Sequence, residues 1–158
     1  MIDRIYHVNV NCSDLDASRE FYKQFGFSVI VEFDEVDAET IRGLGLAETA
    51  KARGVLLGQG TDPALGRETR IDLLEWSDTQ VPSAPGPSAT QLGVPRLALY
   101  TKSLDDEVHR LQDEGLEPVA EIADFSGTGD STLRSRFVCF RDPDGLLVEL
   151  IEFTRTAA

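Results

Sequence analysis

The sequence predicts an α+β fold built from two copies of one βαβββ unit, with eight main strands. The first observation behind this prediction is an internal repeat. The second is that each copy runs an alternating, strand-like pattern into an amphipathic helix. The third is the length of 158 residues, which suffices for a core that needs no disulfide or metal to be stable.

The opening of the repeat is visible as two matching segments. His7–Asp16 and Arg96–Asp105 lie 89 positions apart, and the same register aligns Leu15 with Leu104. Each segment begins with a period of two, which is typical of a half-buried strand. Each continues into apolar residues at helical spacing, which predicts a helix with one buried stripe.

Short signals mark both ends of each helix. Asp14 and Ser103 stand where an N-cap is expected, with a side-chain oxygen available to the free amides of the next turn. Gly26 and Gly115 follow the helices, and glycine readily adopts the left-handed backbone conformation that ends a helix. Another strand is expected after each helix, near Phe27–Phe33 and near Leu116–Ile122.

The closing parts of the two copies also match. Ile71–Glu75 corresponds to Val148–Glu152 at an offset of 77, because the first copy has a longer middle. Both segments are predicted to be the last strand of their module. Before the second, Asp142–Gly145 has proline and glycine at turn positions, so Arg136–Phe140 and Leu146–Phe153 should form a hairpin.

The module boundary is expected at a segment without apolar periodicity. Residues 77–93 are rich in proline, serine and glycine, which is typical of a connector. We therefore expect a first module at residues 1–76 and a second at residues 94–158, within one compact two-module domain.

Two further segments are candidates for the surroundings of a site. Ala38–Leu46 predicts a short helix broken at Gly43 and Gly45, placed over the mouth of a cavity or at a subunit contact. Phe125–Gly129 is a glycine-rich loop without the strand-to-helix context of a phosphate loop, and a lid facing the substrate is the interpretation we favour.

Composition argues against several classes of partner. The net charge of −13 repels phosphate backbones and anionic membranes, so no nucleic-acid or membrane partner is expected. The apolar runs are far shorter than the roughly 18 residues that span a bilayer, and the N-terminus lacks the pattern of a signal peptide, so we expect a cytoplasmic protein. In that setting Cys12 and Cys139 should be free thiols.

Two segments carry a family resemblance. Asp14–Tyr22, which opens the first helix, and Phe140–Glu149, which closes the second module, resemble the vicinal oxygen chelate superfamily of glyoxalases, bleomycin-resistance proteins and extradiol dioxygenases. The resemblance covers about residues 3–154. It implies that the strands of each module curl into a half-open cup that holds a small molecule. It also implies a homodimer, in agreement with the sheet edges that two half-barrels leave open.

The resemblance implies a ligand set for a divalent metal. In the family, each first strand and each last strand commonly contributes one ligand, which here gives His7, Asp72 and Glu149. Imidazole and carboxylates suit Zn, Fe, Ni, Mn or Co. The fourth position is Arg96, where the family usually has histidine, and a guanidinium cannot be a ligand. Arg96 could instead pair with either carboxylate and supply the positive charge itself.

Three functions stay open. The first is an isomerase, lyase or dioxygenase acting on vicinal oxygens, in which a metal or Arg96 polarises the substrate and Glu149 or His7 moves a proton. The second is a binding protein of the bleomycin-resistance type, with Arg96 as anchor for an anionic group. The third is a structural or regulatory dimer held by the charged cluster. We expect His7, Asp72, Arg96 and Glu149 to converge in one cavity.

Four other residues have simpler interpretations. Glu75 and Glu152 should point to the opposite face of their strands and be solvated. Trp76 either lines the cup or caps the core. His109 should be an exposed helix residue with no part in catalysis.

Overall fold

The computed structural model describes residues 5–60, 69–77, 89–90, 92–125 and 133–155. Their elements follow the order β1 (Val8–Asn11), α1 (Leu15–Gln24), β2 (Ser28–Phe33), α2 (Ala38–Gly43), β3 (Ala52–Gln59), β4 (Thr69–Trp76), β5 (Arg96–Tyr100), α3 (Leu104–Asp113), β6 (Ala123–Phe125), β7 (Leu133–Arg141) and β8 (Leu147–Arg155). The predicted fold of two βαβββ modules with eight strands is confirmed, and α2 is an addition to the first module.

The chain divides into two compact units, Met1–Ser83 and Ala84–Ala158, here called module one and module two. Most of the predicted connector at residues 77–93 lies outside the described residues. The same holds for most of the glycine-rich loop at residues 125–129. Among the described helices, none is both long and apolar enough to cross a membrane.

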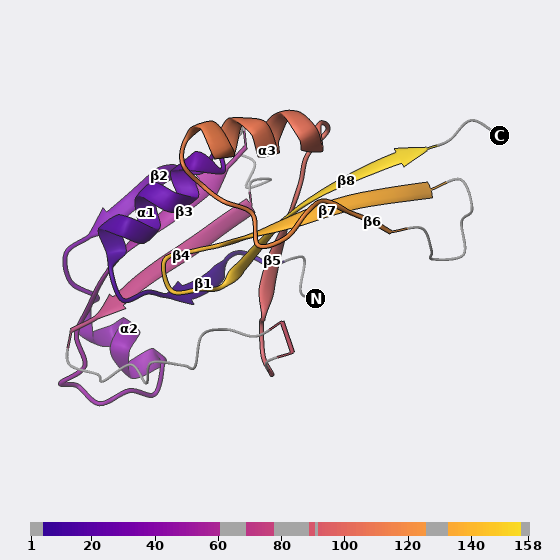
Figure 1. The fold of residues 1–158 in the computed structure, drawn as a ribbon. Coiled ribbons are helices and arrows are strands. Elements are labelled where there is room, and N and C mark those ends of the chain that lie inside the picture. The colour runs from indigo at the N-terminus through magenta and orange to yellow at the C-terminus, as the bar shows by residue number, and fades with distance from the viewer. Residues whose placement is uncertain (1–4, 61–68, 78–88, 91, 126–132, 156–158) are drawn as a thin grey trace. The chain divides into compact units, whose positions relative to one another are not determined.

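The two sheets repeat one topology (Figure 1). Module one has the strand order β1-β4-β3-β2 and module two the order β5-β8-β7-β6. In each sheet the first strand of the module pairs in parallel with the last, and the remaining pairs are antiparallel. Asn9 is paired with Asp72, and Ala98 with Glu149, so the predicted repeat also holds in the register.

Each helix covers one face of its own sheet. In module one, apolar side chains of α1 and of the facing strand positions are buried, among them Leu15, Phe21, Tyr22, Val55, Leu57, Ile71 and Leu73. In module two the corresponding set is Leu104, Val108, Leu111, Val138, Phe140, Val148 and Leu150. This burial occupies alternate strand residues, so the other set of side chains faces away from the helix.

The helix signals are confirmed except for one cap. Asp14 Oδ1 accepts a hydrogen bond from the amide of Ala17, and Gly26 and Gly115 have φ values of +84° and +89°. Ser103 occupies the N-cap position of α3, but its side chain makes no capping hydrogen bond. Its hydroxyl donates to Asp106 instead, because that carboxylate lies one turn ahead.

One predicted strand is wrong. Leu116–Ile122 is irregular, and the strand that follows α3 is the short β6 at Ala123–Phe125. The amide of Val119 donates to the Cys139 carbonyl at 2.8 Å, so the segment touches β7 there. Pro118 has no amide hydrogen and cannot extend such pairing. The corresponding segment of module one, β2, contains no proline and pairs with β3.

The hairpin that closes module two is confirmed. β7 and β8 pair over their whole length, from Leu133 with Arg155 to Arg141 with Leu147. Asp142 holds the turn by accepting hydrogen bonds from the amides of Asp144 and Leu146.

Candidate functional site

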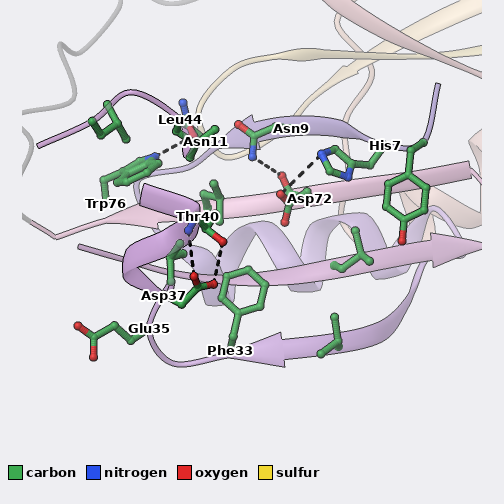
Figure 2. A pocket seen from close by; sticks show the side chains of 16 residues that line it. His7, Asn9, Asn11, Phe33, Glu35, Asp37, Thr40, Leu44, Asp72 and Trp76 are labelled. Carbon is green, nitrogen blue, oxygen red and sulfur yellow. Dashed lines mark hydrogen bonds and ion pairs between the residues drawn. The ribbon is translucent and has the colours of Figure 1, made fainter. Parts of the chain in front are cut away.

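The candidate site of module one lies on the sheet face opposite α1. Along β4, Ile71 and Leu73 are buried on the α1 side. Because side chains alternate, Asp72, Leu74 and Trp76 share the other face. These three residues line a cavity of about 990 Å³. Figure 2 shows this cavity, with side chains converging on it from the strands and from α2.

One end of the cavity holds His7 and Asp72. The Nε2 atom of His7 lies 4.0 Å from Oδ2 of Asp72, and their side chains are 39% and 18% exposed. The amide group of Asn9 donates to the backbone oxygen of Asp72 at 3.0 Å. Burial raises the pKa of the Asp72 carboxyl above its ordinary value, although His7 and Asn9 act against this shift. The neighbouring His7 and Asn9 therefore compensate only part of the cost of burying the negative charge of Asp72.

The other end of the cavity is a wall made by α2 and the residues around it. Asp37 caps the helix by accepting from the amide and the hydroxyl of Thr40. Ile41 anchors it in a small apolar cluster with Val36, Ala52 and Leu74. The predicted short helix of residues 38–46 is thus present, it ends at Gly43, and residues on both sides of it line the cavity.

Trp76 lines the cavity at the α2 end. Its indole Nε1 donates to Oδ1 of Asn11 at 2.9 Å, and both residues face the cavity. Of the two interpretations given to this tryptophan, lining of the cup is the one that the structure supports. The alternation of β1 and β4 already placed Asn9, Asn11 and Trp76 on the face of His7 and Asp72, so this signal was available in the sequence.

Module two places an ion pair at the equivalent positions. Arg96 Nη1 lies 3.0 Å from Oε2 of Glu149, whose side chain is only 6% exposed, whereas that of Arg96 is 51% exposed. No described donor forms a well-directed hydrogen bond with Glu149 Oε2. The contact is therefore a charge pairing that depends on proximity more than on direction.

The thiol of Cys139 lies beside this ion pair. Cys139 is directly opposite Glu149 in the pairing of β7 with β8. Burial raises the pKa of this thiol and the Glu149 carboxylate raises it further, while Arg96 and Arg141 act in the opposite sense. A thiol held in its neutral form is a poor nucleophile. Neither Cys12 nor Cys139 is part of a disulfide.

The predicted site residues therefore form two pairs. His7 and Asp72 meet in module one, and Arg96 and Glu149 meet in module two. The convergence of all four in one cavity stays a prediction. His109, set aside from the sequence, has a side chain that is 82% exposed.

Glu75 and Glu152 do point to the helix side, but the expectation that they are solvated is wrong. Glu75 accepts from the Leu15 amide at 2.7 Å and from Arg53 at 2.8 Å. Glu152 accepts from the Leu104 amide at 3.4 Å and is only 12% exposed. Each carboxylate satisfies the first free amide of its helix, where the helix dipole also favours a negative charge. The alternation of side chains along the strands predicted the sheet face of these two residues. It could not predict their contacts with the helix amides.

The donor atoms do not make a complete metal site within either module. Module one supplies two ligand types, His7 and Asp72, whose facing atoms are 4.0 Å apart and would have to move closer together to share one tetrahedrally coordinated ion. In module two, Glu149 is occupied by Arg96, which would repel a divalent cation. Among the described residues, no group of three or more histidine, cysteine or carboxylate side chains is arranged to hold a metal. The predicted ligand set of His7, Asp72 and Glu149 would require Glu149 to leave Arg96.

Comparison with known proteins decides the family. The model of the Glyoxalase/Bleomycin resistance protein/Dioxygenase superfamily matches residues 4–150. The chain belongs to this superfamily. The matched residues include most of both modules, so the resemblance inferred from the opening helix and the closing hairpin is confirmed. No protein of curated function matches the chain.

Solved structures share the glyoxalase fold at low sequence identity. A glyoxalase family protein from Bacillus cereus is 20% identical, with a TM-score of 0.75 over 97% of this chain and 95% of that one. One from Enterococcus faecalis is 23% identical, with a TM-score of 0.62 over 94% and 97%. A glyoxalase/dioxygenase from Nostoc punctiforme is 21% identical, with a TM-score of 0.57 over 96% and 92%.

Proposed function

We propose that this glyoxalase superfamily member is a small-molecule enzyme of the isomerase or lyase type, which moves a proton next to a carbonyl in the cavity of module one. One observation carries the proposal. His7 Nε2 faces Asp72 Oδ2 at 4.0 Å at one end of a cavity of about 990 Å³. A base beside a carboxylate in a substrate-sized cavity is the arrangement that proton transfer needs.

His7 is the proposed general base. Its imidazole takes a proton from the carbon next to the substrate carbonyl, and the electron pair moves to the carbonyl oxygen to give an enediol-type intermediate. The hydroxyl proton of this intermediate passes to the oxygen of the former carbonyl, and the imidazolium returns its own proton to the former carbonyl carbon. A hydroxyaldehyde and a hydroxyketone thus interconvert without an external oxidant. Ionised Asp72 stabilises the imidazolium in between, because opposite charges at this distance attract strongly in a partly dry site.

Proton exchange tests this function without knowledge of the natural substrate. A panel of hydroxyketones and hydroxyaldehydes is incubated with the protein in D₂O, and deuterium uptake next to the carbonyl is followed by NMR. Uptake should be catalysed by the native chain and fall by about 10²–10⁴-fold in His7→Ala. His109→Ala replaces the chain's other histidine, which is exposed, and should leave the rate unchanged. Equal exchange with and without His7 would contradict the proposal.

A second function is favoured by the ion pair of module two. Arg96 is half exposed while its partner Glu149 is buried, so part of the guanidinium can reach a ligand. This supports the non-catalytic alternative, in which Arg96 anchors an anionic group of a bound molecule. That function predicts binding of carboxylates or phosphates that is lost in Arg96→Ala, with no deuterium exchange in any variant.

The metal-dependent form of the enzyme is tested by one substitution. Arg96→His restores the residue type usual in the family and removes the charge that holds Glu149. If His7, Asp72 and Glu149 converge as predicted, the variant should bind Ni²⁺ or Zn²⁺ in calorimetric titration more tightly than the native chain. A folded variant with unchanged metal affinity would contradict both the convergence and the ligand set.

A further inference from the structure

We propose that the cavity of module one takes an elongated organic molecule without negative charge, with its polar head at His7 and Asp72 and its apolar body at the α2 end. This substrate class rests on the proposed function, because it concerns the same site. It is argued from the charges, the length and the apolar surface of the cavity.

The charges that line the cavity exclude an anionic ligand. Four ionisable side chains other than tyrosine line it, namely His7, Glu35, Asp37 and Asp72, and no lysine or arginine does so among the described residues. The hydrogen bonds from Thr40 lower the pKa of Asp37, so this carboxylate stays ionised. Arg70 stacks on the ring of Tyr6 at 4.5 Å, beside the His7 end, but is not itself a lining residue. A carboxylate or phosphate ligand would therefore face three acidic side chains in the lining and no lining lysine or arginine. A neutral or cationic head meets no such repulsion.

The length of the cavity follows from the strand register. Asp72 and Trp76 lie on the same face of β4, four residues apart, which corresponds to about 13 Å along a strand. In Figure 2, His7 and Asp72 lie toward one end of the cavity and Trp76 and Leu44 toward the other. A compact ligand would touch one end alone, whereas an elongated one can use the polar and the apolar end together.

The α2 end offers apolar surface that a ligand would cover. Leu44 and Leu46 line the cavity there, although they are 55% and 41% exposed. Phe33 and Trp76 add aromatic surface, and the hydrogen bond to Asn11 fixes the indole in place. Apolar side chains left in water at the edge of a polar-headed cavity favour a ligand with a hydrocarbon or aromatic body.

Trp76 provides the readout, because it is the only tryptophan of the chain and lines the cavity. Phenylbutanol, phenylbutylamine and phenylbutyrate share one body and differ in head charge. Titration of the native protein at pH 7, followed by tryptophan fluorescence, should show the alcohol and the amine binding at least about tenfold more tightly than the carboxylate. Equal or tighter binding of phenylbutyrate would overturn the inference.

Two variants locate the effect. Asp72→Asn should strengthen phenylbutyrate binding and weaken phenylbutylamine binding, because it removes one negative charge and little volume. Leu46→Ala should weaken all three probes to a similar extent. Leu92→Ala is the matched control, since Leu92 is 95% exposed and does not line this cavity. If Asp72→Asn still binds the alcohol and the amine as much more tightly than the carboxylate as the native protein does, the polar head of the ligand does not lie at Asp72.

Failure of this inference and failure of the proposed function look different. If phenylbutyrate binds most tightly while deuterium exchange still requires His7, the substrate class is wrong and the enzyme function stands. If none of the three probes changes Trp76 fluorescence at millimolar concentration, the cavity of module one is not a small-molecule site and both fall. Phenylbutyrate binding that is lost in Arg96→Ala would support the binding-protein function in place of this substrate class.

Discussion

The two modules are nearly identical on the helix side of the sheet and different on the other side. Glu75 and Glu152 each accept from the first amide of their helix. Each also lies beside an arginine of the neighbouring strand that reaches the helix, so Arg53 pairs with Asp16 as Arg136 pairs with Asp105. The repeated unit therefore keeps its scaffold through a shared network of charges.

The sheet faces opposite the helices differ between the two modules. Where module one has His7 and Asp72 at 4.0 Å, module two has Arg96 and Glu149 at 3.0 Å. Where Trp76 is bonded to Asn11, module two stacks Phe153 on Tyr100. The scaffold positions are constrained by the helix they hold, whereas the facing positions are free to change with the ligand. This difference supports the proposal that the ligand binds on the sheet face opposite the helix.

The largest expected effect comes from breaking the ion pair of module two. Arg96→Ala leaves Glu149 buried without a cation, and we expect a loss of about 2–3 kcal/mol, reduced from the usual range because Arg96 is half exposed. Urea denaturation measures it. His7→Ala is the equivalent change in module one and should cost less than about 1 kcal/mol, because Asp72 is not fully compensated by His7 in the native chain. Equal losses of unfolding free energy in Arg96→Ala and His7→Ala would contradict the difference between the two pairs.

The next largest loss of stability is expected from substitution of Gly54, in β3 of module one. A Cβ at Gly54 would lie 2.6 Å from the Leu73 carbonyl oxygen and equally close to the Phe33 ring. Gly54→Ala should therefore destabilise by about 2 kcal/mol, since backbone atoms must move. Gly43→Ala is the control: a Cβ there meets nothing within 4 Å, at the end of α2. The control should be neutral or stabilising in thermal unfolding.

The shared network should respond alike in both modules. Glu75→Gln and Glu152→Gln should each cost about 1 kcal/mol at pH 7 by weakening an ion pair and a helix-capping acceptor. Hydrogen bonding to Arg53 lowers the pKa of Glu75 below its ordinary 4.5. Its contribution is thus present above pH 4.5 and lost as pH falls through the folded-state pKa, so the deficit of Glu75→Gln should shrink in acid. A deficit that is independent of pH would indicate that charge plays no part.

The sequence predicted the parts of the fold that follow from local patterns. The period of two gave the strands, the caps and glycines gave the ends of α1, and the Asp142–Gly145 turn gave the β7–β8 hairpin. The prediction of a strand at residues 116–122 was wrong, because Pro118 lacks the amide hydrogen that strand pairing needs although the rest of the repeat matches. The helix-capping contacts of Glu75 and Glu152 could not be predicted, because the amides that they accept from are 60 and 48 residues away in the sequence and alternation gives only the face.

The candidate site was predictable only as a set of residue types. The repeat aligned His7 with Arg96 and Asp72 with Glu149, and alternation placed them on one face of each sheet. Distances depend on packing, and they make one pair loose and the other tight. A cavity and a short helix at its mouth were expected, with a subunit contact as the alternative for the helix. Which residues around α2 line the cavity could not be predicted, because α2 lies in an insertion that the second module lacks and so has no repeat partner for comparison.

The smallest expected effect is also the clearest test of the loose pair in module one. Burial raises the pKa of Asp72 above its ordinary 3.8, so the folded state holds the proton more strongly than the unfolded chain. The contribution of the group to stability is full below pH 3.8 and is lost as pH rises through the folded-state pKa. Asp72→Asn removes that loss and should be more stable than the native chain by about 0.5 kcal/mol at pH 7, with the difference vanishing in acid. Asp34→Asn, at an exposed position of the same module, should show neither effect in urea denaturation across pH. A destabilised Asp72→Asn at pH 7 would mean that the Asp72 charge is well compensated, and module one would then hold a tight pair as module two does.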